Sequence, residues 1–141
     1  MSTGPQLRPM LEADLPGACH LWLNTEGVEL AEGDGLPALA GYLRRNPGHS
    51  FVAEADGRIV GAVLAGHDGR RGFLYHLAVA QDFRGAGVGR SLVDRALAGL
   101  KAAAISRVLL LVSRDNPGGQ AFWTRNGWES LTFAQPMGRD L

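Results

Sequence analysis

Residues 77–92, LAVAQDFRGAGVGRSL, decide the fold of this 141-residue chain. The end of an apolar strand, Leu77–Val79, leads into the glycine-rich turn Arg84–Gly89, and apolar residues at helical spacing follow from Val88. A strand, a glycine-rich turn and a helix in this order create an anion site. The backbone N–H groups of the first helical turn are unpaired there, and the positive end of the helix dipole lies at the same place. The segment therefore predicts phosphate binding, with Arg84 and Arg90 adding charge.

Two nucleotide-binding motifs with glycine-rich turns do not fit this segment. The phosphate loop of NTPases needs a Gly-Lys pair, and the sequence contains none. The dinucleotide fingerprint needs a third glycine where this chain has Arg90. It also opens near the first strand, whereas three antiparallel strands are expected here before the turn. Taken by itself, the turn also fits a glycine-rich helix start that binds nothing.

Helix and strand patterns surround the turn and predict one α/β domain over residues 1–141. Asp56-Gly57 is a two-residue hairpin signal, and Pro117 after Asn116 fits the first position of a helix. We expect a mixed central sheet of about six or seven strands flanked by about four helices. The expected strands are 6–9, 50–55, 58–65, 73–79 and 107–112, with a closing strand or hairpin over 128–137, and the expected helices begin near 14, 36, 88 and 117.

The central segment resembles the core motif of the GNAT family of N-acetyltransferases. That motif is Arg/Gln-x-x-Gly-x-Gly/Ala, and Arg84, Gly87 and Gly89 match it. Before it, Leu77-x-Val79 is similar to the family strand whose backbone pairs with the pantetheine arm of the cofactor.

Other parts of the chain resemble the same family. Asn116, Phe122-Trp123 and Asn126-Gly127-Trp128 are similar to a second family segment, and residues 52–61 are similar to its central hairpin. The resemblance covers nearly the whole chain in the family's order of elements. It implies the single-domain acetyltransferase (GNAT) fold, with the sheet splayed between strands 73–79 and 107–112.

The resemblance implies an enzyme that moves the acetyl group of acetyl-CoA to an amine by direct attack in a ternary complex. Acetyl-CoA is then a co-substrate, and no metal is expected, because the four histidines show no metal-ligand spacing. The cofactor residues that carry over are Leu77, Ala78 and Val79 for pantetheine, Arg84, Gly85, Ala86, Gly87, Val88, Gly89 and Arg90 for the pyrophosphate, and Asn116 and Trp123.

The general base of many family members has no counterpart here. It is a glutamate on the strand before the glycine turn, and Gly72–Ala80 contains no acid. Tyr75 and His76 are the side chains there that could relay a proton. Strand alternation predicts Tyr75, Leu77 and Val79 on one face and His76 on the other. Titration near neutral pH favours His76 as the base, the position of family bases favours Tyr75, and either side chain can instead be structural.

The general acid of many family members is also replaced. Trp123 stands where they have a tyrosine that reprotonates the coenzyme A sulfur, and an indole N–H cannot supply that proton. A thiol with a pKa near ~8.5 is a tolerable leaving group by itself. We therefore expect Trp123 to form a packing wall beside the thioester.

The amino-acid composition limits the class of binding partner and the cellular compartment that the sequence predicts. Fourteen basic residues balance fourteen acidic ones, with no basic run, which argues against nucleic acid. No apolar run approaches the ~20 residues of a membrane span, and no signal peptide is visible. The single cysteine, Cys19, fits a reducing cytoplasm, and the abundance of arginine, alanine and glycine is typical of a GC-rich bacterial genome.

The acceptor is expected to be a small-molecule or peptide amine. Six acids with no Lys or Arg between them would favour a cationic one: Glu12, Asp14, Glu26, Glu29, Glu32 and Asp34. A solvated acidic surface is the alternative explanation of these acids. The sequence does not decide whether the protein forms a homodimer.

Two other functions also stay open. One is an acyl-CoA-binding sensor without turnover, which the missing glutamate and tyrosine favour, and the other is a purely structural α/β domain.

Overall fold

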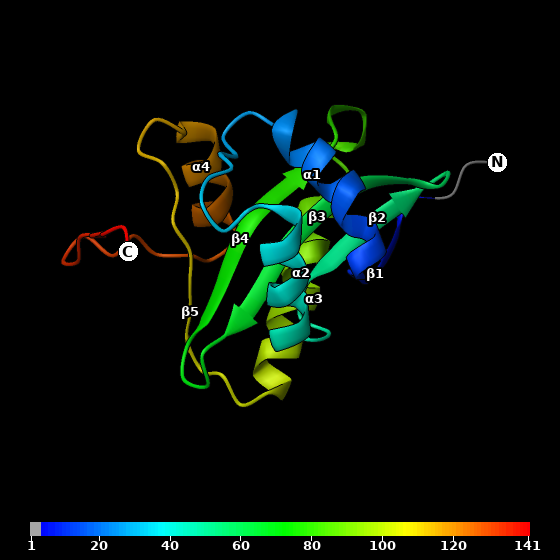
Figure 1. Ribbon diagram of the computed structural model, residues 1–141. Coiled ribbons are helices and arrows are strands. Elements are labelled where there is room, and N and C mark those ends of the chain that lie inside the picture. The colour runs from blue at the N-terminus through cyan, green and yellow to red at the C-terminus, as the bar shows by residue number, and fades with distance from the viewer. Residues whose placement is uncertain (1–3) are drawn as a thin grey trace. The chain divides into compact units, whose positions relative to one another are not determined.

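The computed structural model describes residues 4–141. It contains one five-stranded sheet with strand order β1-β2-β3-β4-β5 (Figure 1). The first four strands are antiparallel to their neighbours, and β5 is parallel to β4. The strands are β1 (Gln6–Pro9), β2 (Phe51–Ala55), β3 (Arg58–His67), β4 (Gly72–Val79) and β5 (Val108–Leu109). The helices are α1 (Leu15–Leu23), α2 (Leu36–Arg45), α3 (Val88–Ala102) and α4 (Pro117–Arg125), with short 3₁₀ turns η1 (Glu12–Asp14) and η2 (Gln81–Phe83).

The mixed α/β sheet and the four helices confirm the predicted fold class, with five strands instead of six or seven. Two strand predictions are wrong in extent. The strand expected over 107–112 is reduced to Val108–Leu109, and residues 128–137 form no strand. The side chains of Leu111, Phe133 and Met137 are 75%, 85% and 93% exposed, so an added strand would lack the apolar burial that holds a strand in place.

The chain divides into two compact units. The first ends at Leu111 and contains the whole sheet with α1, α2 and α3. The second, Val112–Leu141, contains α4 and an irregular segment after it. No residue of α4 is buried, so the extended apolar core belongs to the first unit.

Helices α1 and α2 cover one face of the sheet and α3 covers the other (Figure 1). The core on the first face joins the two helices to β2, β3 and β4 through Met10, Leu15, Ala18, Leu21, Trp22, Leu39, Leu43, Val52, Ala62, Leu64 and Ala78. On the other face, a Cβ atom at Gly61 or Gly72 would lie 3.0 Å from a methyl of Leu92 or Leu100. The absence of a side chain at these two strand positions lets α3 pack closely on the sheet.

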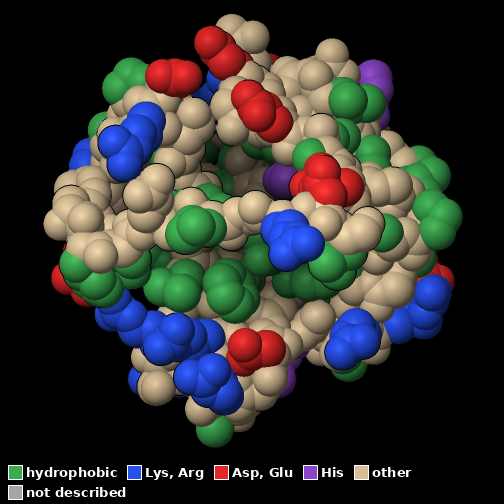
Figure 2. All heavy atoms as spheres, turned by 60° about the vertical axis from the view of Figure 1, so that its left-hand side comes forward, with side chains coloured by type: hydrophobic (Ala, Val, Ile, Leu, Met, Phe, Trp, Pro, Cys, Tyr) green, Lys and Arg blue, Asp and Glu red, His purple; other side chains and the backbone are tan. Residues whose placement is uncertain are grey.

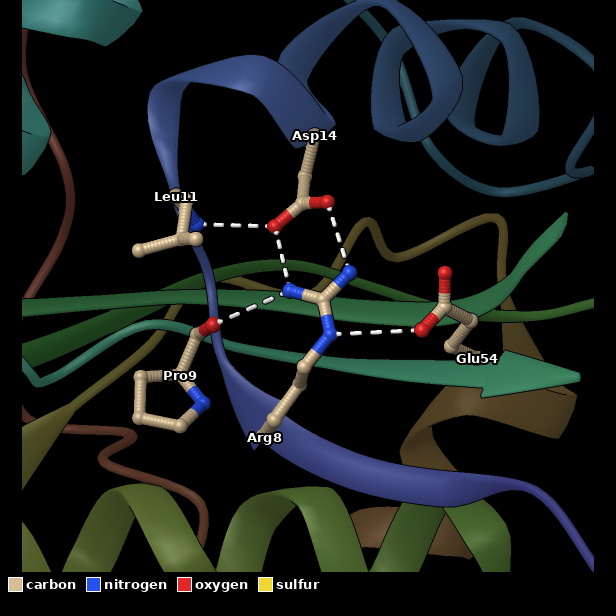
Figure 3. A network of polar contacts seen from close by, with 5 residues as sticks. All are labelled: Arg8, Pro9, Leu11, Asp14 and Glu54. Carbon is tan, nitrogen blue, oxygen red and sulfur yellow. Dashed lines mark hydrogen bonds and ion pairs between the residues drawn. The ribbon is translucent and has the colours of Figure 1, made fainter. Parts of the chain in front are cut away.

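Arg8 ties the first strand to its neighbours (Figure 3). Its guanidinium donates to both carboxylate oxygens of Asp14, at 2.7 and 2.9 Å, and Nε donates to Glu54 on β2 at 3.4 Å. Asp14 also accepts from the backbone N–H of Leu11 at 2.8 Å. The hydrogen bonds from Arg8 hold the pKa of the Asp14 carboxyl below its usual value. This network fixes the path of the chain from β1 into α1.

The described residues contain no helix that is long and apolar enough to cross a membrane. On the face drawn in Figure 2, acidic, basic and hydrophobic side chains are interspersed, and neither sign of charge covers it. That distribution agrees with the balanced composition.

Candidate active site

Strand β4 contains a one-residue bulge at its centre. Before the bulge Tyr75 pairs with Leu64 of β3, and after it Ala78 pairs with Ala62, so three steps along β4 match two along β3. His76 has a φ of 55°, in the left-handed region that residues other than glycine rarely adopt. A bulge leaves its extra residue outside the ladder of backbone hydrogen bonds. His76 is therefore positioned by something other than regular strand pairing.

The bulge makes the predicted alternation along this strand wrong. The sequence predicts Tyr75, Leu77 and Val79 on one face and His76 on the other. Directly paired residues of antiparallel strands share a face, so Tyr75 and Ala78 lie on the face covered by α1 and α2, while Val79 lies on the face covered by α3. The extra residue reverses the alternation, and no glycine marks its position in the sequence.

His76 forms a partly buried pair with Asp34. Its Nε2 lies 2.9 Å from Oδ1 of Asp34, and the two side chains are only 16% and 15% exposed. A carboxylate only accepts hydrogen bonds, so this contact forms when Nε2 carries the proton and donates it. The indole of Trp22, which is fully buried on α1, lies 5.2 Å from the imidazole, centroid to centroid. Asp34 and Trp22 thus hold the ring from two sides.

Tyr75 belongs to an aromatic group on the same face of the sheet. Its ring stacks on Phe73 at 6.1 Å and meets the edge of Tyr42 from α2 at 6.4 Å. Burial raises the pKa of the Tyr75 phenol above its ordinary value of 10. The phenol therefore keeps its proton at neutral pH.

The turn predicted to bind phosphate follows β4 and η2. Gly85 and Gly87 have φ values of 81° and 82°, and a Cβ atom at either position would meet no atom within 4 Å. Gly87 is the N-cap of α3, and no side chain of the described residues caps this helix, so the N–H groups of its first turn face outward. Nε of Arg84 donates to the carbonyl oxygen of Val79 at 2.9 Å and fastens the turn to the end of β4. The result is an open, positively polarised cradle.

The second edge of β4 is paired only at its beginning. β5 pairs with Gly72 and Phe73, and no described strand lies beside the rest of β4 on that edge. This is the splay predicted between strands 73–79 and 107–112. Leu77, Ala78 and Val79 lie on the unpaired stretch. An open strand edge presents backbone N–H and C=O groups to an extended ligand.

The second unit contains the other two predicted cofactor residues. Asn116 is the N-cap of α4, and its Oδ1 accepts from the backbone N–H of Gly119 at 2.9 Å. Trp123 lies edge-on to Phe122 and to Trp128, with ring centroids 5.1 and 5.2 Å apart. Within its own unit, Trp123 is therefore the centre of an aromatic cluster.

The predicted site residues from Tyr75 to Arg90 lie in the first unit, from the middle of β4 to the first turn of α3. Asn116 and Trp123 belong to the second unit. Sequence reasoning missed Asp34 as the partner of His76. It had marked Asp34 only as one of six acids, and no spacing rule links residues 42 positions apart. Among residues 4–141, no group of three or more His, Cys, Asp or Glu is placed to hold a metal ion.

Comparison with known proteins identifies relatives of this architecture. The family model described as the acetyltransferase (GNAT) family matches residues 16–128. An acetyltransferase of Pectobacterium atrosepticum is 42% identical over 89 residues, which is 63% of this chain and 63% of that protein. The matched region thus spans less than two thirds of that relative.

Solved structures share the fold. Ard1 from Thermoplasma volcanium superimposes with a TM-score of 0.77 at 21% identity, over 89% of this chain and 82% of that one. A Mycobacterium tuberculosis protein solved in complex with coenzyme A gives a TM-score of 0.70 at 25% identity, over 87% of this chain and 70% of that one.

Proposed function

Because the chain belongs to the acetyltransferase (GNAT) family, we propose that it transfers the acetyl group of acetyl-CoA to an amine by direct attack in a ternary complex. One observation carries the proposal: the open edge of β4 is followed, after the short turn η2, by the glycine-rich turn at the start of α3. The edge offers backbone groups to an extended, amide-bearing arm, and the turn offers unpaired N–H groups to the pyrophosphate next to it.

The residues present fit coenzyme A. The positions where a side chain would obstruct the pyrophosphate are Gly85 and Gly87, and both are open. Leu77, Ala78 and Val79 bind the pantetheine arm through their backbone, and the family resemblance also assigns Asn116 and Trp123 to cofactor contacts. The pyrophosphate is held by Arg84, Gly85, Ala86, Gly87, Val88, Gly89 and Arg90. Acetyl-CoA supplies an acetyl group activated as a thioester.

Acetyl transfer to an amine requires that the nitrogen lose a proton before it attacks. A primary amine has a pKa near ~10.4, so at neutral pH a base in the site increases the reactive fraction. Of Tyr75 and His76, we favour His76 for this role, because an imidazole exchanges protons near neutral pH and burial raises the pKa of the Tyr75 phenol further above that range. The thiolate leaves without an acid from Trp123, which packs and does not donate a proton to sulfur.

The acceptor we propose is a small-molecule or peptide amine that carries positive charge. The segment between α1 and α2 bears the exposed carboxylates Glu26, Glu29 and Glu32, with no basic residue among them. Carboxylates of one sign attract cationic ligands and raise their rate of association. Asp34, on the same segment, is bonded to His76 and is not counted with them. We place the reaction in a bacterial cytoplasm.

A second candidate function is an acyl-CoA sensor that binds the cofactor without turnover. The absence of an acid between Gly72 and Ala80, together with a tryptophan at position 123, favours it. The sensor keeps the open β4 edge and the glycine-rich turn, so cofactor binding alone does not separate it from the enzyme.

Two measurements in series test these functions. Acetyl-CoA and coenzyme A should raise the melting temperature, whereas ATP and NAD should do so much less, since the turn matches only the coenzyme motif. Thiol release from acetyl-CoA is then followed with polyamines, amino acids, aminoglycosides and peptide N-termini. Release with an amine supports the enzyme, and stabilisation without release supports the sensor. Equal stabilisation by NAD would contradict the cofactor assignment.

A further inference from the structure

His76 occupies a backbone conformation that costs free energy. A residue other than glycine in the left-handed region is strained and persists only where surrounding contacts impose it. Here those contacts are the hydrogen bond to Asp34 and the indole of Trp22. The contact with Asp34 also links β4 to the segment between α1 and α2. Strain combined with a partly buried acid–imidazole pair points to a chemical role for the pair.

We propose that Asp34 is a positioning residue that holds the His76 imidazole as the Nε2–H tautomer, with Nδ1 as the atom that accepts a proton from the acceptor amine. This inference rests on the proposed acetyl transfer. A base hydrogen-bonded to a third group that fixes its tautomer is a recurrent arrangement in enzymes that activate nucleophiles. No hydrogen bond to Nδ1 from residues 4–141 occupies that nitrogen.

The proposed step balances in atoms and charge. Nδ1 of His76 takes one proton from the ammonium form of the acceptor, and the freed nitrogen lone pair forms a bond to the thioester carbonyl carbon of acetyl-CoA. The carbon–sulfur bond breaks with its electron pair on sulfur. The second proton on nitrogen passes to the thiolate, and the imidazolium returns its proton to water. Asp34 stabilises the imidazolium through the interval.

The other titratable groups around the pair are few. Tyr75 lies on the same strand, with its ring 6.4 Å from the imidazole, and Tyr42 lies beside it on α2. Burial raises the pKa of both phenols, so they remain neutral. Cys19 on α1 lies near Asp34, and burial together with that carboxylate raises the pKa of its thiol. Asp34 is therefore the charged group that faces the imidazole.

The first arm of the test reads the tautomer directly and needs no acceptor. Nitrogen-15 NMR of the whole chain at a pH where His76 is neutral should show a protonated Nε2 and an unprotonated Nδ1, with the signal assigned by its loss in His76→Gln. In Asp34→Asn, the side-chain amide can donate to Nε2, so the Nδ1–H tautomer should increase. A predominant Nδ1–H tautomer in the unmodified protein would overturn the inference whatever the enzyme does.

The second arm measures the rate with an amine accepted by the unmodified protein. Asp34→Asn should lower kcat/KM by about 10–100-fold, as supporting residues of reactive groups do. General damage to the fold would lower the rate in proportion at every pH, so the pH profile is recorded for both proteins. Asp34→Glu should recover part of the rate. The affinity for acetyl-CoA should not change in either variant.

Two further variants separate positioning from general damage. Asp34→Asn added to His76→Gln should cost nothing beyond His76→Gln alone, because residues that act as a unit are not additive. Asp94→Asn removes an exposed carboxylate of α3, on the opposite face of the sheet from the pair, and should leave the rate unchanged. Turnover by the unmodified protein with an unaltered Asp34→Asn rate and pH profile would disprove the positioning role. An absence of turnover with every amine would count against the proposed function. The NMR measurement would still test the predicted tautomer of His76, because it needs no acceptor.

Discussion

Two acid–base pairs of similar geometry have different surroundings in this molecule. Arg8 and Asp14 meet at 2.7 Å, and His76 and Asp34 meet at 2.9 Å, each with a carboxylate that is at most 15% exposed. Arg8 is always charged and lies in a regular strand, and its other hydrogen bonds close the network around it. His76 can gain and lose a proton, lies in a strained bulge and borders an open strand edge.

This difference separates the part of the protein that maintains the fold from the part that is built for binding and reaction. The packed part of the sheet has its backbone paired and its space filled, so a change there should alter stability alone. The end of β4 has unpaired backbone, an open glycine turn and a titratable pair, so a change there should alter binding or rate. Each of the following variants tests this division.

The largest effect is expected from Gly87→Val. The backbone of Gly87, with a φ of 82°, approaches the cofactor pyrophosphate in the proposed complex, and a branched side chain would block it. A ligand at 100 times its Kd stabilises a protein by about 2.7 kcal/mol, and we expect this stabilisation by acetyl-CoA to disappear. Thermal melting with and without acetyl-CoA measures it.

Gly69→Val is the matched control for Gly87→Val. Gly69 has a φ of 92° in the turn between β3 and β4, where a Cβ would also meet no atom within 4 Å. It should cost a similar amount of stability through backbone strain and keep the response to acetyl-CoA. An acetyl-CoA response that survives in Gly87→Val would remove the turn from the cofactor site.

The next largest effect is expected from Gly66→Ala in the packed part. A Cβ there would lie 2.5 Å from the hydroxyl of Tyr42 and 2.6 Å from Cγ of Asn46, whose Oδ1 already accepts from the N–H of His67. Overpacking of this kind costs about 1–3 kcal/mol. Urea unfolding should show that loss, while acetyl-CoA binding is unchanged.

Gly41→Ala supplies a control of opposite sign on α2. A Cβ at Gly41 would meet only the end of the Arg44 side chain, at 4.0 Å, and alanine is the better helix former by about 1 kcal/mol. The variant should therefore be more stable than the unmodified protein. Equal effects of the two glycine replacements would mean that Tyr42 and Asn46 move aside without cost.

A smaller effect, with a defined pH dependence, is expected from Asp14→Asn. Hydrogen bonds to charged groups contribute about 1.5–3 kcal/mol, so the variant should lose free energy of unfolding by an amount in the lower part of this range at pH 7. The folded pKa of Asp14 lies below its unfolded value near ~3.9. The stabilisation is therefore fully present above that unfolded value and is lost as the pH falls through the folded pKa.

Urea titrations at pH 7, 5 and lower values compare the two proteins. The difference in unfolding free energy should be constant between pH 7 and pH 5 and should shrink in more acidic solution. Glu12→Gln, in the exposed pair with Arg44, should change stability by less than about 1 kcal/mol. If the difference in unfolding free energy between Asp14→Asn and the unmodified protein did not shrink in acid, the charge of Asp14 would not be the cause of that difference. Acetyl-CoA binding should be unaffected in both variants.

Much of the packed part could be predicted from the sequence, because it depends on local patterns. The strand Gln6–Pro9 and the helix Leu36–Arg45 have the predicted bounds, and the Asp56-Gly57 hairpin joins β2 and β3 as expected. The glycine-rich turn was also found, since its residues are contiguous. Neither the bulge at His76 nor its partner Asp34 could be predicted. A histidine with positive φ leaves no mark in the sequence, and a contact over 42 residues follows only from the tertiary fold.

The smallest effect is expected at Trp123, which tests whether the second unit contributes proton chemistry. Its ring packs against Phe122 and Trp128, so a change there should be felt as a change of shape. Trp123→Phe should keep most of kcat, with any loss appearing in acetyl-CoA binding. Trp123→Tyr restores the acid that many GNAT relatives use and should still give no large gain at neutral pH, because a coenzyme thiolate leaves unaided.

General acid catalysis is typically worth about 10²–10⁴-fold, so a missing acid would be plain in the rate of Trp123→Tyr. A gain of that size, with a new limb at high pH where the phenol ionises, would mean that the unmodified chain lacks an acid it needs. The acyl-CoA sensor would then be favoured over the enzyme, and the strained His76–Asp34 pair would remain without a reaction to serve. An unchanged rate leaves proton handling at the β4 bulge, where the titratable pair lies.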